Sequence, residues 1–144
     1  MNIITRDFGE IKINKEDIIT FTQPIIGFDD YKKFIILHDE DTSRQIAWIQ
    51  SIEETELCFI VIDPSTTVRD YKNKFNLPES VKRYLGEGEY EFWLIMVVSD
   101  DIKQSTINLK SPILINPENR LAMQLVLEED LPIRYPLFDR KGDN

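Results

Sequence analysis

The amino-acid sequence predicts a mainly β protein, a single antiparallel β barrel or sandwich with one short helix. Most of the chain consists of short segments rich in β-branched and aromatic residues, separated by turn-forming or charged residues. Only one stretch carries both start and stop residues of a helix. The sequence shows no internal repeat and no Gly/Ser-rich linker, so residues 1–144 are expected to form a single domain.

The chain opens with a predicted hairpin. Residues 3–5 and 11–13 are its two arms, and Gly9 can take the positive φ that tight turns require. Side chains alternate between the two faces of a strand, so Ile11 and Ile13 are expected to face inward together.

Four more strands are expected at residues 18–21, 34–37, 46–52 and 57–62. The segments 34–37 and 57–62 are apolar without alternation. A half-buried strand would alternate, so these two are expected to be buried on both faces or covered by another element. They are the best candidates for the core.

The predicted helix covers residues 78–85. Proline suits the first helical position, Glu79 favours the positive N-terminal end, and Gly86 supplies a stop. Its buried stripe is expected to consist of three residues: Val81, Tyr84 and Leu85.

The second half of the chain continues with extended segments. The longest strand is expected at residues 90–99, followed by pieces at 106–109, 112–116 and 123–127. The Pro-Glu-Asn sequence at 117–119 makes the turn between the last two.

The C-terminal stretch, residues 131–144, contains Pro132 and Pro136 and ends in polar residues. Proline interrupts regular hydrogen bonding, so this tail is expected to be poorly ordered or draped over the surface. The residues that would hold it there are Ile133, Tyr135, Leu137 and Phe138.

Charge argues against a nucleic-acid ligand. The chain has 17 Lys and Arg against 26 Asp and Glu, a net charge of −9 and a pI near 4.6. Binding to phosphates needs clustered cations, and here they are scattered, so direct contact with nucleic acid is not expected. An acidic surface serves solubility or steers a basic partner, and composition favours solubility.

The expected location is the cytoplasm. Cys58 is the single cysteine, so no disulfide can form within the chain, and the first residues do not resemble a secretion signal. The longest apolar run, residues 92–98, is far below the ~18 residues that a membrane-spanning helix needs.

Catalytic and cofactor motifs are not found, so we expect neither enzymatic activity nor a cofactor or metal. His38 is expected to be a satisfied imidazole at a strand end, and Cys58 to be packed in a core. Residues 39–44 begin like a calcium loop, but Arg44 replaces the glycine that such a loop needs. The glycines do not cluster into a phosphate-binding loop.

Acidic residues gather between the predicted strands, at residues 39–41, 53–56, 87–91 and 128–130. Several such loops at one end of a barrel would form a negative rim for a basic protein. The residues predicted to contact a partner are Glu53, Glu54, Glu56, Asp63 and Asp70. Phe28 has two readings, an exposed anchor or a plug for the barrel end, and the plug is favoured.

Three segments together resemble the flagellar assembly factor family, FliW. They are residues 21–28, ending in Ile-Gly-Phe; residues 108–116, with the sequence Asn-Leu-Lys-Ser-Pro-Ile-Leu-Ile-Asn; and residues 120–127, with Gln124. The resemblance extends over nearly the whole chain. Departures from the family pattern include Pro24 and Ile26 before Gly27, Ser111 in place of a common alanine, and Tyr135 in place of a frequent histidine.

The resemblance implies a partner switch. Members of this family bind flagellin in the cytoplasm and, when flagellin has been exported, bind the carbon storage regulator, a small mRNA-binding translational repressor. Capture of the repressor relieves the repression of flagellin translation. The family-motif residues are expected to be structural rather than to contact a partner: Gly27, Asn108, Leu109, Pro112 and Asn116.

Two other classes of function stay open at this stage. A small-ligand-binding β barrel would need a hollow interior, whereas an interior filled by Trp48, Phe59 and Trp93 would exclude it. An acid–base enzyme built on paired carboxylates would need at least one strongly raised carboxyl pKa in a cleft.

Overall fold

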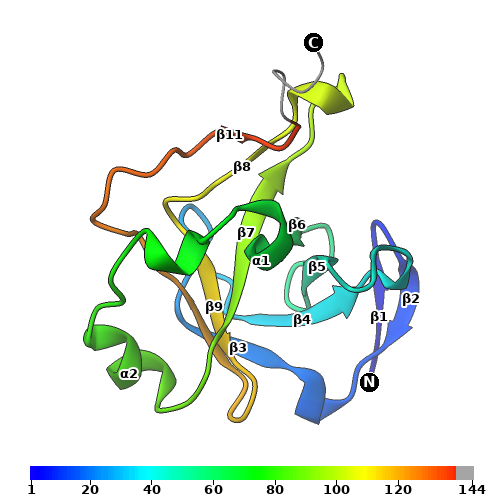
Figure 1. The fold of residues 1–144 in the computed structure, drawn as a ribbon. Coiled ribbons are helices and arrows are strands. Elements are labelled where there is room, and N and C mark those ends of the chain that lie inside the picture. Colours follow the sequence, from blue (N-terminus) through cyan, green and yellow to red (C-terminus); the bar gives the residue numbers. More distant parts are fainter. Residues whose placement is uncertain (139–144) are drawn as a thin grey trace.

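A computed structural model describes residues 1–138. Seven strands close into a barrel in the order β7, β6, β5, β4, β3, β10 and β9, and β9 pairs back onto β7 (Figure 1). Their bounds are β3 Ile19–Gln23, β4 Lys33–His38, β5 Ile46–Ser51, β6 Cys58–Ile62, β7 Glu91–Val97, β9 Ile113–Asn116 and β10 Leu121–Gln124. The mainly β fold is confirmed and, of the two predicted architectures, the structure is the barrel.

One neighbouring pair in the barrel is parallel, which departs locally from the predicted antiparallel pairing. β10 runs parallel to β3, with Leu121 opposite Thr20 and Ala122 opposite Phe21. The other six neighbouring pairs of the barrel are antiparallel. A closed ring with an odd number of strands cannot alternate direction all the way round, so one parallel pair is required.

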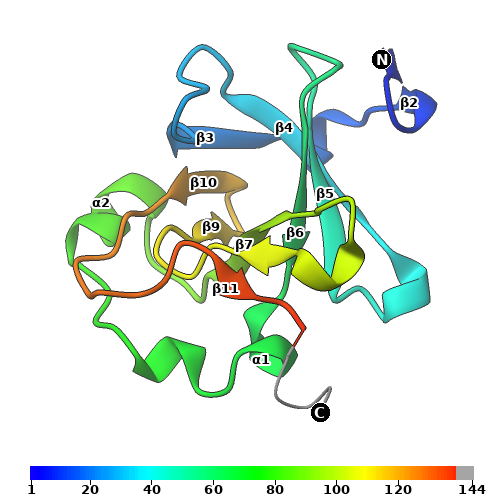
Figure 2. The same cartoon turned by 90° about the horizontal axis from the view of Figure 1, so that it is seen from above.

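Two smaller pairs of strands flank the barrel (Figure 2). The predicted hairpin is formed by β1 (Asn2–Thr5) and β2 (Gly9–Lys12), and Gly9 has a φ of +65°. Ile13 is buried and Ile11 is half-buried. On the other side, β8 (Thr106–Ile107) pairs with β7, and β11 (Tyr135–Pro136) pairs with β8.

Two hydrophobic cores share the barrel wall. The first fills the barrel and contains Phe21, Phe34 and Ile49. The second lies between the outside of the wall and the segments that cover it, with Tyr71 and Leu94 among its members. A second covered surface is why apolar residues occur on both faces of some strands.

Strand β6 shows this double burial directly. Phe59 and Val61 pack in the barrel interior, whereas Ile60 and Ile62 pack in the second core. The prediction that residues 57–62 are covered on both faces is therefore confirmed. Its physical basis is the period of two in a strand, which sends successive side chains to opposite faces.

Within residues 1–138 the predicted helix is α2 (Ser80–Leu85), and a single further α-helical turn, α1 (Pro64–Thr67), was not predicted. Before α1, the Asp63 side chain accepts a hydrogen bond from the Ser65 amide, a capping pattern present in the sequence but not recognised. No helix in residues 1–138 is long and apolar enough to cross a bilayer.

Helix α2 ends where the prediction places its end but begins two residues later, at Ser80 rather than at Pro78. It ends before Gly86, which has a φ of +77°, and Val81 and Leu85 are fully buried. Tyr84 was expected to be buried as well, but it is 39% exposed. Val81 and Leu85 are four residues apart and share a face, whereas Tyr84 lies at the edge of that narrow stripe.

The strand predicted at residues 123–127 begins two residues earlier and ends three residues earlier, at Leu121–Gln124. Beyond it, the Leu125 amide donates to the Pro112 carbonyl oxygen and the Leu127 amide to that of Lys110. These bonds keep the segment extended, although it has left the regular barrel. Proline 112 has no amide hydrogen, so a regular ladder cannot continue past it.

Residues 131–138 lie across the second core. Leu131, Tyr135 and Leu137 pack against it, and the Leu137 amide donates to the Ser105 carbonyl oxygen. Ile133 and Phe138, which were expected to take part, are 59% and 39% exposed. The rest of the predicted tail, residues 139–144, lies outside the described residues.

The asparagines of the 108–116 segment bind backbone groups. The Asn108 Oδ1 accepts from the amides of Lys110 and Ser111 at 3.0 and 3.1 Å. The buried Asn116 donates from Nδ2 to the carbonyl oxygens of Leu85 and Glu87 at 2.8 and 3.1 Å, and its Oδ1 accepts from the next turn. Asn116 thereby joins the end of α2 to the barrel.

We predict that Asn116→Ala lowers the free energy of unfolding by about 3 kcal/mol, because the buried Asn116 side chain makes three hydrogen bonds, to the Leu85 and Glu87 carbonyl oxygens and from the Glu118 amide, and all three are lost. Urea denaturation measures the loss. The matched control is Asn119→Ala, since exposed Asn119 also donates to the Leu85 carbonyl oxygen, at 2.8 Å. A control loss of about 1 kcal/mol is expected; equal losses in the two variants would contradict the role given to Asn116.

Candidate protein-contact surface

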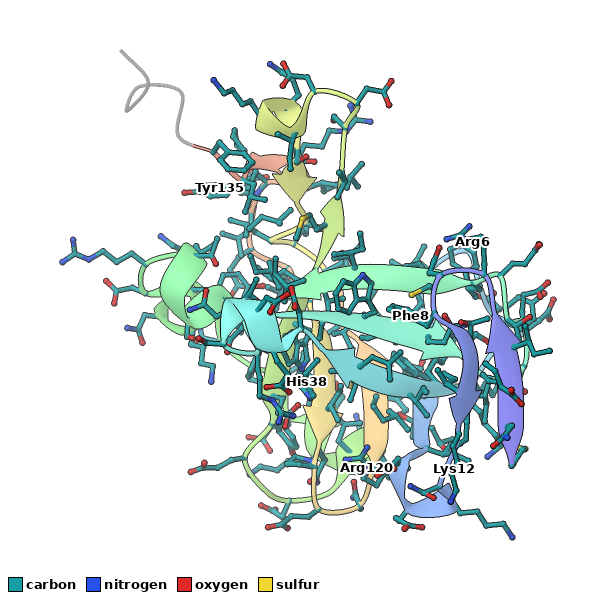
Figure 3. All side chains as sticks on the ribbon, turned by 90° about the vertical axis from the view of Figure 1, so that its right-hand side faces the viewer. Arg6, Phe8, Lys12, His38, Arg120 and Tyr135 are labelled. Carbon is teal, nitrogen blue, oxygen red and sulfur yellow. The ribbon has the colours of Figure 1, made fainter. Side chains whose placement is uncertain are left out.

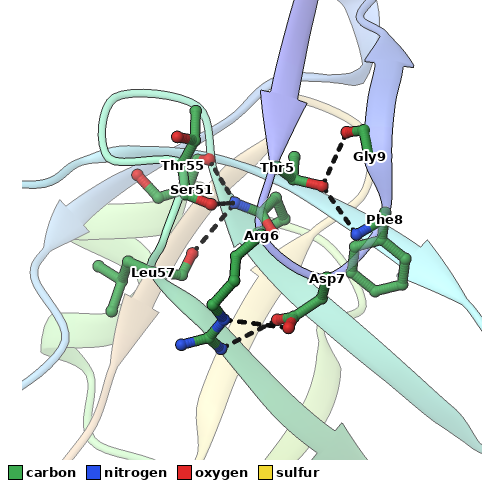
Figure 4. Close-up of polar contacts among 9 residues, drawn as sticks. Thr5, Arg6, Asp7, Phe8, Gly9, Ser51, Thr55 and Leu57 are labelled. Carbon is green, nitrogen blue, oxygen red and sulfur yellow. Dashed lines mark hydrogen bonds and ion pairs between the residues drawn. The ribbon is translucent and has the colours of Figure 1, made fainter.

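The loop between β5 and β6 is built around one buried amide. Gln50 is fully buried, and its Nε2 donates to the carbonyl oxygens of Ser51, Thr55 and Leu57 at 2.9, 3.1 and 3.2 Å (Figure 4). The two N–H groups of this amide are shared among the three carbonyl oxygens, which holds the loop in a defined shape. The loop carries three of the acidic residues predicted to contact a partner.

Glu53 has a structural role in this loop. Its Oε1 accepts from the amides of Lys32 and Lys33 at 2.7 and 2.9 Å, which ties the loop to the start of β4. The Ser51 Oγ accepts from the Glu53 and Glu54 amides at 3.1 and 2.9 Å. Glu56 is exposed and Glu54 half-exposed, so these two carboxylates are the ones free to meet a partner.

The tip of the β1–β2 hairpin reaches the same loop. The Arg6 amide donates to the Thr55 carbonyl oxygen at 3.3 Å. The Arg6 guanidinium makes two bonds of 3.0 Å to the exposed Asp7 carboxylate. Thr5 shapes the turn, since its Oγ1 accepts from the Phe8 amide at 2.9 Å (Figure 4).

A hollow of about 380 Å³ lies between the hairpin tip and the outer face of β5 and β6. Its apolar lining includes Phe8, Trp48 and Ile60, and the Phe8 and Trp48 rings meet edge to face with centroids 5.3 Å apart. An apolar hollow beside charged loops has the character of a protein-contact surface.

Of the three aromatic residues whose packing inside the barrel would exclude a ligand-binding barrel, Trp48 lies outside the barrel. Its neighbours Ala47 and Ile49 are fully buried inside the barrel, so the alternation of β5 turns the indole outward. The other two, Phe59 and Trp93, belong to the interior core.

Phe28 lies at the end of the barrel, on the loop that Glu53 ties down. It is half-buried, and its ring packs edge to face on Phe59 with centroids 5.1 Å apart. The preceding turn contains Gly27 with a φ of +89°, and the Ile26 amide donates to Gln124 Oε1 at 2.7 Å. Phe28 thus occupies the position expected of a plug for the barrel end, rather than that of an exposed anchor. This position also keeps Phe28 close to the acidic loop.

The structure does not bring all the predicted contact residues together. Antiparallel strands deliver successive loops to opposite ends, so Asp63 after β6 and Asp70 lie at the other end from the loop after β5. There Asp63 caps α1, and Asp70 has a φ of +55° and lies 4.0 Å from Arg69. The acidic segments 39–41 and 87–91 flank β4 and β7 at that same far end.

The one cysteine on this surface, Cys58, is held in its protonated, unreactive form. Burial raises the pKa of the Cys58 thiol to about 11, with a smaller contribution from the charge of Asp7. Within residues 1–138, no group of three His, Cys, Asp or Glu side chains is placed to hold a metal ion.

His38 is not the satisfied imidazole that we expected. Its Nδ1 is shielded from solvent and has no hydrogen-bond partner among the described residues, and its ring lies 5.8 Å from that of Trp93. Burial lowers the pKa of His38, and the charges of Arg44 and Arg120 lower it further, against the opposing effect of Glu91 and Glu40.

The residues that sequence reasoning missed are Arg6, Phe8 and Trp48. The hairpin itself was predicted, but its docking site was not, since Phe8 meets a tryptophan forty positions later in the chain. The sequence signal for this docking site was Phe8, an aromatic residue within the turn of the hairpin.

The fold defines a small β-barrel protein, and the candidate contact surface lies on the outside of the barrel. Residues 2–137 match the profile of the FliW protein family. Flagellar assembly factor FliW of Natranaerobius thermophilus is 37% identical, with 99% of this chain and 95% of that protein covered. The same factor of Caldanaerobacter subterraneus subsp. tengcongensis is 35% identical, with 96% and 94% covered.

A solved structure agrees with these relatives. A crystal structure of the flagellar assembly factor FliW superposes with a TM-score of 0.89 at 29% identity, and covers 98% of this chain and 99% of that one. The chain belongs to the FliW family of flagellar assembly factors.

We predict that Cys58 reacts slowly with iodoacetamide in the folded protein. A thiol pKa of about 11 in place of 9.0 leaves about a hundredfold less thiolate at pH 8. The alkylation rate, followed by mass spectrometry, should rise sharply in urea, where the thiol is exposed. Equal rates with and without urea would contradict the burial of this thiol.

Proposed function

We propose that this flagellar assembly factor acts in the cytoplasm by binding flagellin and, when free of flagellin, by binding and antagonising the carbon storage regulator. That regulator is an mRNA-binding translational repressor, so its capture would relieve the repression of flagellin translation. The role needs no enzymatic step, no cofactor and no direct contact with nucleic acid or membrane.

The observation that carries this proposal is the hollow at the hairpin tip. It combines apolar walls from Phe8, Trp48 and Ile60 with a neighbouring loop that presents Glu54 and Glu56. Interfaces commonly place an aromatic anchor at the centre and charged groups at the rim. A partner with an apolar side chain surrounded by basic residues fits this arrangement.

Charge supports the same partner chemistry. The net charge of −9 produces a negative field that speeds encounter with a basic, RNA-binding protein. Rim charges act mostly on the association rate and are screened by salt, whereas the apolar hollow supplies affinity that salt does not weaken.

The alternative functions find less support. The barrel interior is filled by packed side chains such as Phe21, Phe34 and Ile49, which leaves the small-ligand barrel without its required hollow. The carboxyl groups whose pKa clearly shifts, Asp7 and Glu129, have it lowered, by hydrogen bonds from Arg6 and from the Asn76 amide. An acid–base enzyme would instead call for a raised carboxyl pKa.

The test is calorimetric titration of the protein with the carbon storage regulator at low and moderate salt, repeated with flagellin already bound. We expect binding that weakens with salt and is lost in the presence of flagellin. Absence of heat with either partner would sink the proposal, and binding of both at once would remove the switch.

A pair of charge-reversal variants locates the contact. Glu54→Lys with Glu56→Lys should weaken binding of the regulator about tenfold at low salt, since exposed charge pairs contribute up to ~1 kcal/mol each. The matched control reverses two exposed acids at the opposite end, Glu89→Lys with Glu118→Lys, with the same change in net charge. Equal weakening in both would show that only net charge matters and would move the contact elsewhere.

A further inference from the structure

A second hollow, of about 340 Å³, lies away from the hairpin tip, where β2, the end of β4 and the start of β10 meet. Three cationic side chains line it, those of Lys12, Arg44 and Arg120, together with His38 and a single carboxylate, Asp17. Figure 3 shows Lys12, His38 and Arg120 on one face of the molecule. We call this hollow the basic groove, and it stands out on a chain whose net charge is −9.

The cations of the basic groove are poorly compensated by the protein itself. Within residues 1–138, Lys12 and Arg120 have no ion pair within 4.0 Å. Arg44 has one, to Glu40 at 3.6 Å, and both side chains are largely exposed. Such a pair contributes little and exchanges readily for another carboxylate.

Arg120 is placed by its backbone contacts. Its Nη2 donates to the Asp17 carbonyl oxygen at 2.9 Å, and its Nε is shielded from solvent with no acceptor among the described residues. A guanidinium has five N–H donors, so most of its capacity is unused. Buried polar groups without partners are rare in folded proteins and indicate a role beyond packing.

Both arginines have a strained backbone. Arg44 has a φ of +67° and Arg120 of +64°, in the left-handed region that residues with a Cβ rarely adopt. Glycine or asparagine would relieve this strain at either position. Two of the four such non-glycine residues in the described chain thus line the same groove, and strain of this kind concentrates at functional sites.

The floor of the basic groove is apolar. Ile13 and Ile35 are buried beneath it, and Ile36 and Leu37 are half-buried at its surface. His38 and Arg44 also line a further hollow of about 350 Å³, and we treat this adjoining hollow as the continuation of the groove. An extended chain can reach from one hollow into the other, whereas a compact ion occupies only one of them.

We infer that the basic groove binds an extended peptide segment of a partner protein, with a carboxylate side chain of that segment held by Arg44, Arg120 and Lys12. The planar guanidinium fork matches a carboxylate, and the apolar floor accepts a neighbouring aliphatic side chain. The site is separate from the hairpin-tip hollow, so the inference holds whichever protein binds there.

A nucleic acid fits the groove less well. It would carry a negative charge at every nucleotide, and the continuation of the groove is lined by Asp63 and Glu91 as well as by cations. A peptide with one carboxylate can place neutral or basic residues against those acids.

The test is a titration of the ¹⁵N-labelled protein followed by NMR. The probe is the peptide acetyl-Ala-Leu-Glu-Leu-Ala-amide, with the matched peptide that has Gln in place of Glu, and a ten-residue oligothymidylate. We expect saturable shifts of the Lys12, His38, Arg44 and Arg120 signals with the Glu peptide and at least tenfold weaker binding of the Gln peptide. Equal binding of both peptides, no saturable shift, or tighter binding of the oligonucleotide would each overturn the inference.

Substitutions of the two arginines test where the carboxylate of the Glu peptide binds. Arg44→Met and Arg120→Met should each weaken the Glu peptide about fivefold or more, and the double variant should not bind it. Arg69→Met is the control, because that side chain is 97% exposed and lies outside the groove. Arg120→Lys keeps the positive charge but loses the planar guanidinium. Its affinity for the Glu peptide should lie between those of Arg120→Met and the unchanged protein. Undiminished binding by the double variant would show that the carboxylate binds elsewhere.

Discussion

Closure of the barrel through the parallel pair of β3 and β10 is the constraint on which the other features depend. The Thr20 amide donates to the Arg120 carbonyl oxygen at 2.9 Å, and Thr22 Oγ1 to that of Ala122 at 3.2 Å. Closing the ring leaves no free edge among the seven strands, so each strand is fixed in register by two neighbours. Parallel strands also begin at the same end, which is why Arg120 lies beside Asp17 and can line a groove with Arg44.

The barrel wall separates two cores. The candidate contact surface lies at the margin of the outer core, where no other segment covers the wall completely. Ile60 packs against the second core and also lines the hollow at the hairpin tip. The hairpin covers part of this margin through the edge-to-face contact of Phe8 with Trp48, and the remaining apolar surface lies next to the acidic loop that Gln50 shapes. The same strands therefore carry the interior core on one face and, on the other face, both the second core and the candidate contact surface.

The direction of the strands decides at which end of the barrel each charged loop lies, and the local sequence does not. Because β4, β5 and β6 alternate in direction, the acidic segment 53–56 after β5 lies at one end of the barrel, whereas residues 39–41 after β4 and Asp63 after β6 lie at the other. The cations of the basic groove come from three distant parts of the chain, so none of them formed a cluster in the sequence. A protein with one acidic and one basic contact surface can distinguish partner segments by charge.

Much of this fold follows from local patterns in the sequence. The positions of β3 to β7, the turn at Gly9 and the stop at Gly86 were predictable, since they depend on side-chain alternation and on backbone preferences of single residues. What the tertiary structure alone decided was the pairing: the parallel β3–β10 contact, the outward face of Trp48 and the separation of Asp63 from Glu56. Pairing joins residues up to a hundred positions apart, and no local preference specifies which distant strands meet, because that choice depends on closing one ring around one packed core.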